Sequence, residues 1–92
     1  MKRVRIHITG RVQGVFYRVY TRDFARRLSV CGHVKNLRDG RVEIVAEGPE
    51  DLLKELAEWA KNKGSPASQI HNTKEQWETI GKCQFSDFQI LH

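Results

Sequence analysis

The chain has 92 residues, which is enough for one compact domain with a modest core and too few for two independent domains. Sixteen Lys and Arg residues against eleven Asp and Glu residues give a net charge of +5, which favours anionic partners such as nucleic acid, a membrane surface or a phosphorylated metabolite. No apolar run is long enough for a secretory signal or a membrane span, so we expect a cytoplasmic protein with no membrane partner.

The two cysteines, Cys31 and Cys83, lie far apart in the sequence and match no metal-ligand spacing. They are also too few for a disulfide scaffold. The four histidines show no ligand spacing with one another or with the cysteines. We therefore expect free thiols in a reducing cytoplasm, no metal and no cofactor.

Residues 3–9, RVRIHIT, alternate apolar and polar side chains, which predicts a β-strand with Arg5 and His7 on the face away from the core. A helix is predicted to follow from Tyr17. Its large apolar residues recur at spacings of four, four and three and mark one stripe: Tyr20, Phe24, Leu28 and Cys31. Gly32 comes next, at the position where a glycine commonly ends a helix.

Residues 33–48, HVKNLRDGRVEIVAEG, contain two short extended runs around Asp39-Gly40. This dipeptide is a strong hairpin signal, because both residues tolerate the positive φ of a type I′ turn. The sequence therefore predicts two antiparallel neighbouring strands.

A second helix is predicted after Gly48-Pro49, because acidic residues follow the proline and apolar residues then recur at helical spacing. Gly64 is predicted to end this helix. Residues 65–79 carry few apolar side chains and are interpreted as a polar edge strand. A final strand is predicted around residues 85–91.

The resulting order is β, α, β, β, α, β with a possible extra strand. Two helices on one face of an antiparallel sheet make a ferredoxin-like α+β sandwich of two layers, which we expect as a single domain over residues 1–92. This scaffold hosts many unrelated functions, so the fold alone does not decide the activity.

The loop before the first helix favours an anion. In residues 10–18, GRVQGVFYR, the backbone N–H groups from Gln13 to Tyr17 can converge in a turn beside the positive end of the helix dipole. Arg18 stands at the helix start, where its charge is unfavourable unless an anion shares the site. A guanidinium can also bind two phosphate oxygens at once. The alternative is a solvated stripe of arginines, which we prefer for Arg22 and Arg26.

Asn36 is unusual, because asparagine is depleted in strands and this one lies inside a predicted strand. One interpretation is a local hydrogen bond to the backbone or the start of the loop. The other is a neutral amide that holds a water molecule in a fixed orientation.

At these two segments the sequence resembles a known family. GRVQGVFYR and GHVKNLRDGRVE are similar to the two signature segments of the acylphosphatases. The resemblance implies metal-free hydrolysis of acyl phosphates to carboxylate and inorganic phosphate, with Arg18 binding the phosphate and Asn36 orienting the attacking water. It implies these substrate-binding residues: Gln13, Gly14, Val15, Phe16, Tyr17 and Arg18. The chain departs from the family pattern at Tyr17, His33 and Arg38.

The chemistry needs few groups. The leaving carboxylate has a conjugate acid with a pKa of about 4, so it departs without a general acid. A loose phosphoryl-transfer transition state leaves the protein mainly positioning and electrostatic work. His7 is a candidate nucleophile, but its alternating position makes it a surface ring in our interpretation.

The main alternative is a nucleic-acid binding module, since the RNA-recognition motif shares this element order and the chain is basic. That motif presents aromatic residues on its third strand. Here the open face of the strand RVEIVAEG presents Glu43 and Glu47, which would repel a phosphate backbone. We expect no nucleic-acid partner and a monomer. A small-molecule or interaction module on the same scaffold is the third option.

Overall fold

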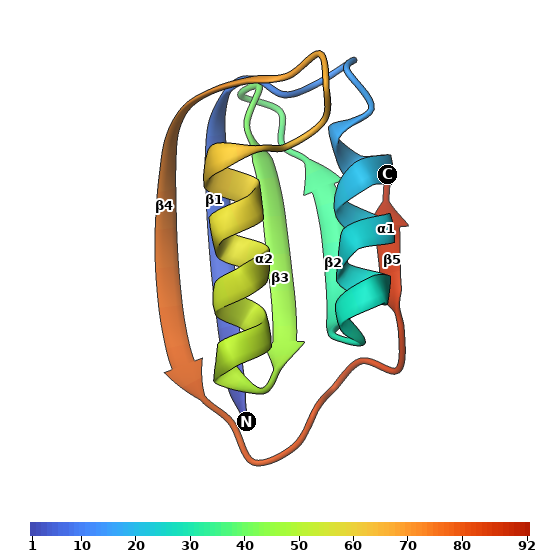
Figure 1. The fold of residues 1–92 in the computed structure, drawn as a ribbon, viewed down its shortest axis with the longest axis vertical. Coiled ribbons are helices and arrows are strands. Elements are labelled where there is room, and N and C mark those ends of the chain that lie inside the picture. Colours follow the sequence, from blue (N-terminus) through green and yellow to red (C-terminus); the bar gives the residue numbers. More distant parts are fainter.

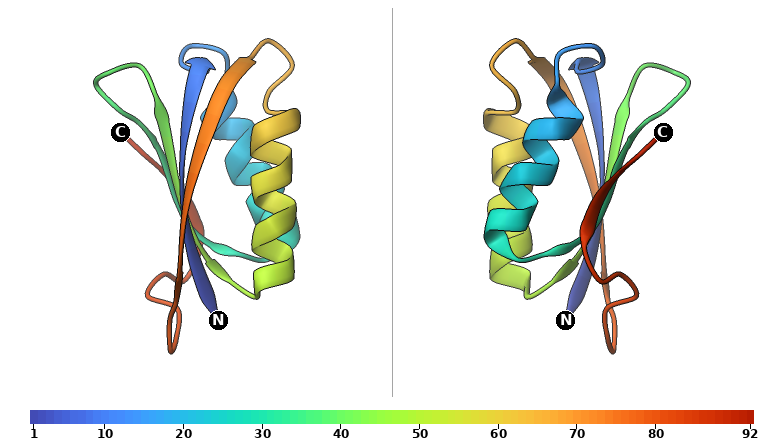
Figure 2. Two further views of the ribbon diagram at one scale, coloured as in Figure 1. Left: turned by 90° about the vertical axis from the view of Figure 1, so that its left-hand side faces the viewer. Right: turned by 90° about the vertical axis from the view of Figure 1, so that its right-hand side faces the viewer.

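The computed structural model describes all 92 residues, which form two layers. Seven elements follow one another along the chain: β1 (Lys2–Arg11), α1 (Tyr17–Leu28), β2 (Cys31–Asn36), β3 (Val42–Gly48), α2 (Glu50–Asn62), β4 (Gln69–Thr79) and β5 (Phe88–Leu91). The strands form one sheet in the order β4-β1-β3-β2-β5 (Figure 1). Both helices cover the same face of this sheet and leave the other face open (Figure 2). The predicted ferredoxin-like α+β sandwich is confirmed.

The sheet is mixed rather than wholly antiparallel. The three pairs within β4-β1-β3-β2 are antiparallel, whereas β5 runs parallel to β2. The polar strand predicted within residues 65–79 is β4, which occupies the edge beside β1. The chain then crosses below the sheet to its other edge (Figure 1), and this crossover makes β5 enter alongside β2 in the same direction.

The core lies between the sheet and the helices. The apolar residues of β1 are fully buried and pair in register with those of β3, so that Val4 faces Ala46 and Ile6 faces Ile44. This pairing confirms the predicted alternation of β1, in which every second side chain faces the helices.

The first helix ends earlier than the sequence predicts. α1 stops at Leu28, and Ser29 caps it in the left-handed conformation with φ 60°. The Ser29 N–H donates to the carbonyl oxygens of Ala25 and Arg26. Gly32 instead lies inside β2 with φ 145°, where a Cβ would sit 1.9 Å from the Val45 carbonyl oxygen. A glycine is therefore required at position 32 because the neighbouring strand packs closely against it, and not because it caps a helix.

The buried stripe of α1 also differs from the prediction. The fully enclosed side chains are Tyr17, Thr21 and Ala25, whereas Tyr20 is 45% exposed. Thr21 and Ala25 are small, which allows the helix to approach the sheet, and the Thr21 hydroxyl is satisfied by the Tyr17 carbonyl oxygen at 2.8 Å. Phe24, which was predicted to belong to the buried stripe, is only partly buried and stacks on Trp59 of α2.

The hairpin between β2 and β3 forms without a type I′ turn. Gly40 has φ 96°, but Asp39 does not adopt a positive φ. The Gly40 N–H donates to the Leu37 carbonyl oxygen at 3.2 Å and the Leu37 N–H to the Arg41 carbonyl oxygen at 2.8 Å. The Asp39 carboxylate accepts the Arg41 N–H and its guanidinium, and these bonds lower the pKa of Asp39.

Neither of the two helices has the length and apolar character that crossing a bilayer requires.

Candidate active site

One cavity of about 330 Å³ unites the two motifs that the sequence analysis singled out. The loop after β1, the start of α1, the end of β2 and the C-terminal end of the chain contribute to its lining. The lining residues are Val12, Gly14, Phe16, Tyr17, Arg18, Val19, Asn36, Ile90 and His92. None of them is acidic. Arg18 and Asn36 therefore share one cavity although they belong to different elements, and this cavity is electrostatically suited to an anion.

Arg18 is the second residue of α1, whose first turn contains no acidic residue. Its Nη1 lies 3.4 Å from the Leu91 carbonyl oxygen and 3.4 Å from His92 Nδ1, both of which are long contacts. No carboxylate pairs with this guanidinium, in contrast to Arg22, which pairs with Asp23, and Arg26, which pairs with Asp87. Arg18 therefore keeps its charge-assisted donors available for a ligand.

The loop between β1 and α1 offers further donors. The backbone N–H groups from Gln13 to Phe16 donate to no acceptor in the protein. Gly14 has φ 75°, and Phe16 caps α1 in the left-handed region with φ 62° and without a side-chain cap. A left-handed conformation costs a residue with a side chain about 1 kcal/mol or more, and such strain concentrates at functional sites. Four unpaired amides thus precede an uncapped helix start, and two of their residues, Gly14 and Phe16, line the cavity together with Arg18.

The side chains of this loop fix its position. Val15 is buried in the core, and the Gln13 side-chain amide donates to the carbonyl oxygens of Leu37 and Arg41 at 2.8 and 2.9 Å. The Tyr17 hydroxyl donates to the Ala60 carbonyl oxygen at 2.9 Å, and burial raises the pKa of Tyr17. The side chains of these three residues therefore hold the loop. Tyr17 lines the cavity, whereas Gln13 and Val15, which the sequence predicted as binding residues, do not.

Asn36 is the last residue of β2, not a residue in its middle as the sequence suggested. Its Oδ1 is buried and accepts no hydrogen bond from the protein. A buried acceptor without a donor costs about 1–3 kcal/mol, so this oxygen, in a residue that lines the cavity, is a candidate acceptor for a ligand or a water molecule. The Asn36 side-chain oxygen makes no local hydrogen bond to the backbone, whereas its position at the end of β2 agrees with the alternative that it begins the loop. The water-holding role stays a prediction.

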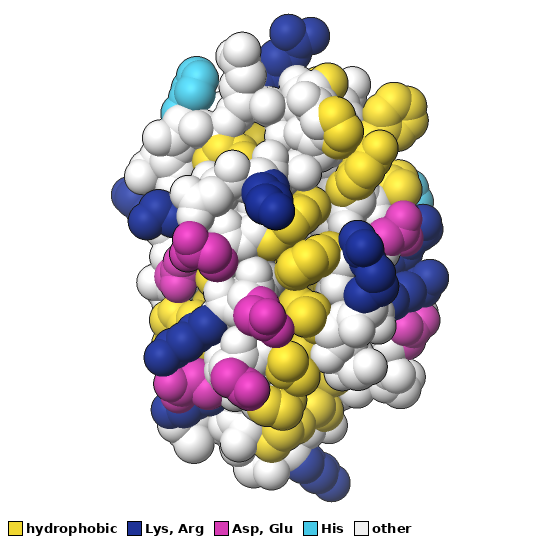
Figure 3. All heavy atoms as spheres, viewed as in Figure 1, with side chains coloured by type: hydrophobic (Ala, Val, Ile, Leu, Met, Phe, Trp, Pro, Cys, Tyr) yellow, Lys and Arg dark blue, Asp and Glu magenta, His cyan; other side chains and the backbone are white.

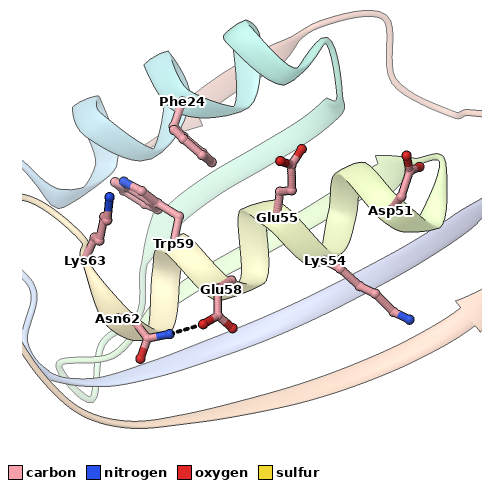
Figure 4. Close-up of a pocket in the computed structure, with 8 residues that line it drawn as sticks. All are labelled: Phe24, Asp51, Lys54, Glu55, Glu58, Trp59, Asn62 and Lys63. Atoms are coloured by element: carbon pink, nitrogen blue, oxygen red, sulfur yellow. Dashed lines mark hydrogen bonds between the residues drawn. The ribbon is translucent and has the colours of Figure 1, made fainter.

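A larger groove of about 540 Å³ lies elsewhere, between the two helices. Phe24 of α1 and Trp59 of α2 point toward each other in it, with ring centroids 5.3 Å apart (Figure 4). Figure 3 shows apolar side chains as a band between the helices, with acidic side chains beside it. Its lining includes Asp51, Glu55 and Glu58, which makes it unsuitable for a phosphate.

Sequence reasoning missed the contribution of the C-terminus. Ile90 and His92 reach the cavity because β5 pairs with β2, which ends at Asn36. No motif in the sequence marks them, since their position depends on the parallel pairing of a short edge strand. His7 lies outside the cavity on the open sheet face, where its Nε2 is 2.8 Å from the Glu43 carboxylate.

The open face differs from the prediction at Glu47, which is fully buried instead of exposed. Its carboxylate accepts hydrogen bonds from Arg3 and from the Gln84 N–H. The structure also brings Cys31, Glu47 and Cys83 together, with their ligand atoms within 4.8 Å of one another, although their sequence spacing gave no sign of it. This cluster lies where β2 begins, at the opposite end of that strand from Asn36.

The sequence and the structure were compared with those of known proteins. The acylphosphatase family model matches residues 4–90. The chain is 43% identical to human acylphosphatase-2 over 93 residues, which cover 100% of this chain and 94% of that protein. It is 45% identical to the acylphosphatase of Pyrobaculum islandicum over 94 residues, covering 99% and 97% of the two chains. The crystal structure of acylphosphatase from Bacillus subtilis superposes with a TM-score of 0.93 at 39% identity over the full length of both chains. The chain belongs to the acylphosphatase family.

Proposed function

We propose that this acylphosphatase binds the phosphoryl group of its substrate between Arg18 and the amides of the Gln13–Phe16 loop, and that Asn36 orients the attacking water. One observation carries the proposal. A single cavity without acidic residues is lined by Arg18, whose guanidinium pairs with no carboxylate, by Gly14 and Phe16, whose backbone N–H groups are unpaired, and by Asn36, whose buried Oδ1 accepts no hydrogen bond.

The phosphoryl oxygens carry the charge that the site must neutralise. Arg18 can bind two of them through parallel N–H donors, and the loop amides can bind the others as they do at helix N-termini elsewhere. These donors are fixed before the substrate arrives, because Gln13 and Val15 hold the loop. Such preorganised donors stabilise the transition state without reorganising during the reaction.

The attacking water needs an orientation more than it needs a strong base. Asn36 Oδ1 can accept one of its hydrogens, so that an oxygen lone pair of the water faces the phosphorus atom. The P–O bond to the acyl group breaks as the new P–O bond forms. The products are a carboxylate and inorganic phosphate.

The leaving group explains why the cavity requires no acid. A carboxylate whose conjugate acid has a pKa of about 4 departs as an anion at neutral pH. Neither a metal ion nor a phosphorylated enzyme is needed in this scheme, and we propose that the reaction uses neither. The cavity also has apolar walls, including Val12, Val19 and Ile90, and we propose that they contact the acyl group.

We further propose that residues 1–92 act as one domain, as a cytoplasmic monomer without a nucleic-acid partner. The two-layer arrangement with one apolar core of 17 buried residues supports one domain. The burial of Glu47 leaves Glu43 as the carboxylate of β3 that reaches the open face. No aromatic residue of β3 is available there for stacking on bases, which disfavours the RNA-binding alternative.

The experiment that tests the phosphate site compares Arg18→Gln, Arg18→Lys and Arg22→Gln with the parent enzyme on benzoyl phosphate. Arg18→Gln is expected to lose turnover by about 100-fold or more and to weaken inhibition by inorganic phosphate. Lys should restore little, because it cannot form the bidentate contact. Arg22 lies on the same helix outside the cavity, so its variant should stay near the parent. Near-parental turnover in Arg18→Gln contradicts the assignment.

A further inference from the structure

A second cluster of reactive side chains lies far from the cavity. Cys31 begins β2, and Cys83 lies in the irregular segment of residues 80–87 that crosses below the sheet between β4 and β5 (Figure 1). Their sulfur atoms and a carboxylate oxygen of Glu47 all lie within 4.8 Å of one another. Both cysteines are free thiols and half-buried. The proposed mechanism uses none of these groups.

The carboxylate in this cluster is already occupied. Oε2 of Glu47 lies 2.6 Å from both Nε and Nη2 of Arg3, and Oε1 accepts the Gln84 N–H at 2.6 Å. A metal ion at the cluster would have to displace this permanent cation from a fully buried partner, which is costly. The geometry therefore disfavours a metal centre and leaves the two thiols to react with each other.

We propose that Cys31 and Cys83 form a thiol–disulfide pair that closes an intramolecular bond when a low-molecular-weight disulfide such as oxidised glutathione oxidises it. In a reducing cytoplasm the pair rests as two thiols, and oxidation fastens the 80–87 segment to the beginning of β2. The Cys31–Cys83 pair is thus a site of reversible modification at the end of the sheet opposite the active-site cavity.

The exchange proceeds in two steps. The Cys83 thiolate attacks one sulfur of oxidised glutathione, forms a mixed disulfide and releases one glutathione thiolate. Cys31 then gives its proton to solvent, attacks the Cys83 sulfur and releases the second glutathione thiolate. Two protein thiols are oxidised and one glutathione disulfide is reduced to two thiols.

The order of attack follows from the surroundings of Cys31. Burial, the neighbouring Cys83 and the charge of Glu47 raise the pKa of Cys31 to about 12. Its Sγ also donates to the Glu47 carbonyl oxygen at 3.5 Å. The Cys31 thiol is therefore protonated while Cys83 is free, and Cys83 attacks first, because the thiolate is the nucleophile in exchange. Once Cys83 is part of the mixed disulfide it no longer raises the pKa of Cys31, which then loses its proton and resolves the intermediate.

The structure allows the bond with a small movement. Sulfur atoms are about 2.0 Å apart in a disulfide, so the two sulfurs need to approach by less than about 3 Å. The later part of the segment is anchored, because the Gly32 N–H donates to the Asp87 carbonyl oxygen at 2.9 Å and Phe85 contacts the His33 ring. The Gln84 N–H is also held by Glu47, so the movement falls on residues 80–83, which have no regular secondary structure.

The bond should stabilise the fold without changing the active site. It encloses most of the chain between β2 and β5, and disulfides that close long loops restrict the unfolded state most. We expect the oxidised protein to melt roughly 10 °C higher than the reduced protein. Turnover of benzoyl phosphate should change by less than about twofold, since the cavity lies at the other end of β2.

The test incubates the folded protein of residues 1–92 with oxidised glutathione and then counts free thiols, measures the intact mass and maps the cross-linked peptides. The parent should lose both thiols and two hydrogen masses, with a peptide that joins Cys31 to Cys83. Cys31→Ser should instead keep one glutathione on Cys83, because it lacks the resolving thiol. Cys83→Ser should remain largely unmodified. Circular dichroism and turnover of each variant confirm that it is folded.

Three results would overturn the proposal. The first is a folded parent whose two thiols still titrate after treatment. The second is a parent that keeps the glutathione adduct or forms only dimers linked between chains. The third is a reduced parent that binds one Zn²⁺ and thereby shields both thiols, which would make the cluster a metal site.

Discussion

The side-chain amide of Gln13 donates a hydrogen bond of 2.8 Å to the carbonyl oxygen of Leu37. Leu37 directly follows Asn36, so this bond connects the proposed phosphate loop to the residue proposed to orient water. The same amide reaches the Arg41 carbonyl oxygen at 2.9 Å. Gln13 therefore fixes the relative position of the two motifs without itself lining the cavity.

Replacing Gln13 with Ala should lower kcat/KM by about 10-fold and destabilise the protein by about 1 kcal/mol, because two half-buried carbonyl groups lose their side-chain donor. Each carbonyl keeps one backbone donor, Gly40 N–H for Leu37 and Leu37 N–H for Arg41, so neither is left unpaired. Steady-state kinetics and urea unfolding measure the two effects. Gln76→Ala is the matched control, since Gln76 is exposed on the edge strand β4 and makes no side-chain hydrogen bond within the protein. Equal activity in both variants would show that the Gln13 contact does not position the site.

Activity should survive exhaustive chelation. The cavity lining contains one histidine and no cysteine or carboxylate, which is too few ligands for a divalent ion, and the leaving group needs no Lewis acid. Turnover after dialysis against EDTA checks this expectation. If chelated enzyme loses activity and regains it with Mg²⁺ or Zn²⁺, the metal-free scheme is wrong. The Cys31 variants separate an effect at the distant thiol cluster from one at the cavity.

Ser29→Gly should stabilise the protein by about 1 kcal/mol, because Ser29 holds φ 60° at the end of α1, where glycine carries no steric cost. The side chain is exposed, so no core contact is lost. The urea midpoint should rise while the slope of the unfolding transition stays constant. Ser86→Gly in the irregular 80–87 segment serves as a control, since Ser86 does not adopt a positive φ and should gain nothing.

Glu43 should make stability depend on pH. Burial acts to raise the pKa of Glu43, but the His7 hydrogen bond and the charges of Lys35 and Arg5 outweigh it and hold this pKa below its ordinary value. The folded protein therefore binds fewer protons here than the unfolded chain, so the stabilisation is present above the ordinary glutamate pKa of about 4.3 and is lost as pH falls through the folded pKa.

Glu43→Gln should accordingly be less stable than the parent at pH 7 by up to about 1 kcal/mol, with the difference disappearing near pH 3. Urea unfolding at several pH values measures it. Glu55→Gln provides the comparison, because Glu55 is exposed on α2 and pairs with no cation. A pH-independent difference between Glu43→Gln and the parent would mean that shape and not charge accounts for the effect.

Much of the fold could be predicted from local patterns. The alternation of apolar and polar residues in β1 and the glycines that flank α2 are signals contained in short stretches of sequence. The structure confirms the strand and the helix that they predicted. The end of α1 could not be predicted in this way. The spacing of the large apolar residues predicted that Tyr20 is buried and that the helix reaches Cys31. In the structure the small side chains of Thr21 and Ala25 are buried against the sheet instead, and the helix ends at Leu28. Gly32 supplied a cap signal, but its actual role depends on a neighbouring strand.

In the site, too, features that depend on one short segment could be predicted, whereas features that depend on contacts between distant segments could not. Arg18 and the loop belong to one continuous segment, so a local motif was sufficient to predict that Gly14, Phe16, Tyr17 and Arg18 share one cavity, while their part in binding stays a prediction. Ile90 and His92 enter through the parallel pairing of β5 with β2, which no short-range pattern specifies. The thiol cluster was missed for the same reason, because the crossover from β4 to β5 brings Cys83 next to Cys31.

Asn36 allows binding to be separated from chemistry. If its amide orients the water and contacts the phosphate little, its removal should affect the transition state far more than the ground state. Asn36→Ala should therefore lose kcat by about 100-fold while the inhibition constant of inorganic phosphate changes by less than about threefold. The buried Oδ1 accepts no hydrogen bond from the protein, so its loss should not destabilise the fold.

Asn36→Asp tests the same residue with its shape preserved. The carboxylate keeps an acceptor but places a negative charge beside a dianionic substrate, so both turnover and phosphate binding should fall. Thermal unfolding of both variants is measured in parallel, because an unfolded variant imitates a catalytic one. A folded Asn36→Ala enzyme with turnover within a few-fold of the parent, or with phosphate affinity that falls together with turnover, would assign the water to another group. In that case Asn36 would be a residue of the β2 end that shapes the cavity, and the amides of the Gln13–Phe16 loop would be the next candidates for holding the water.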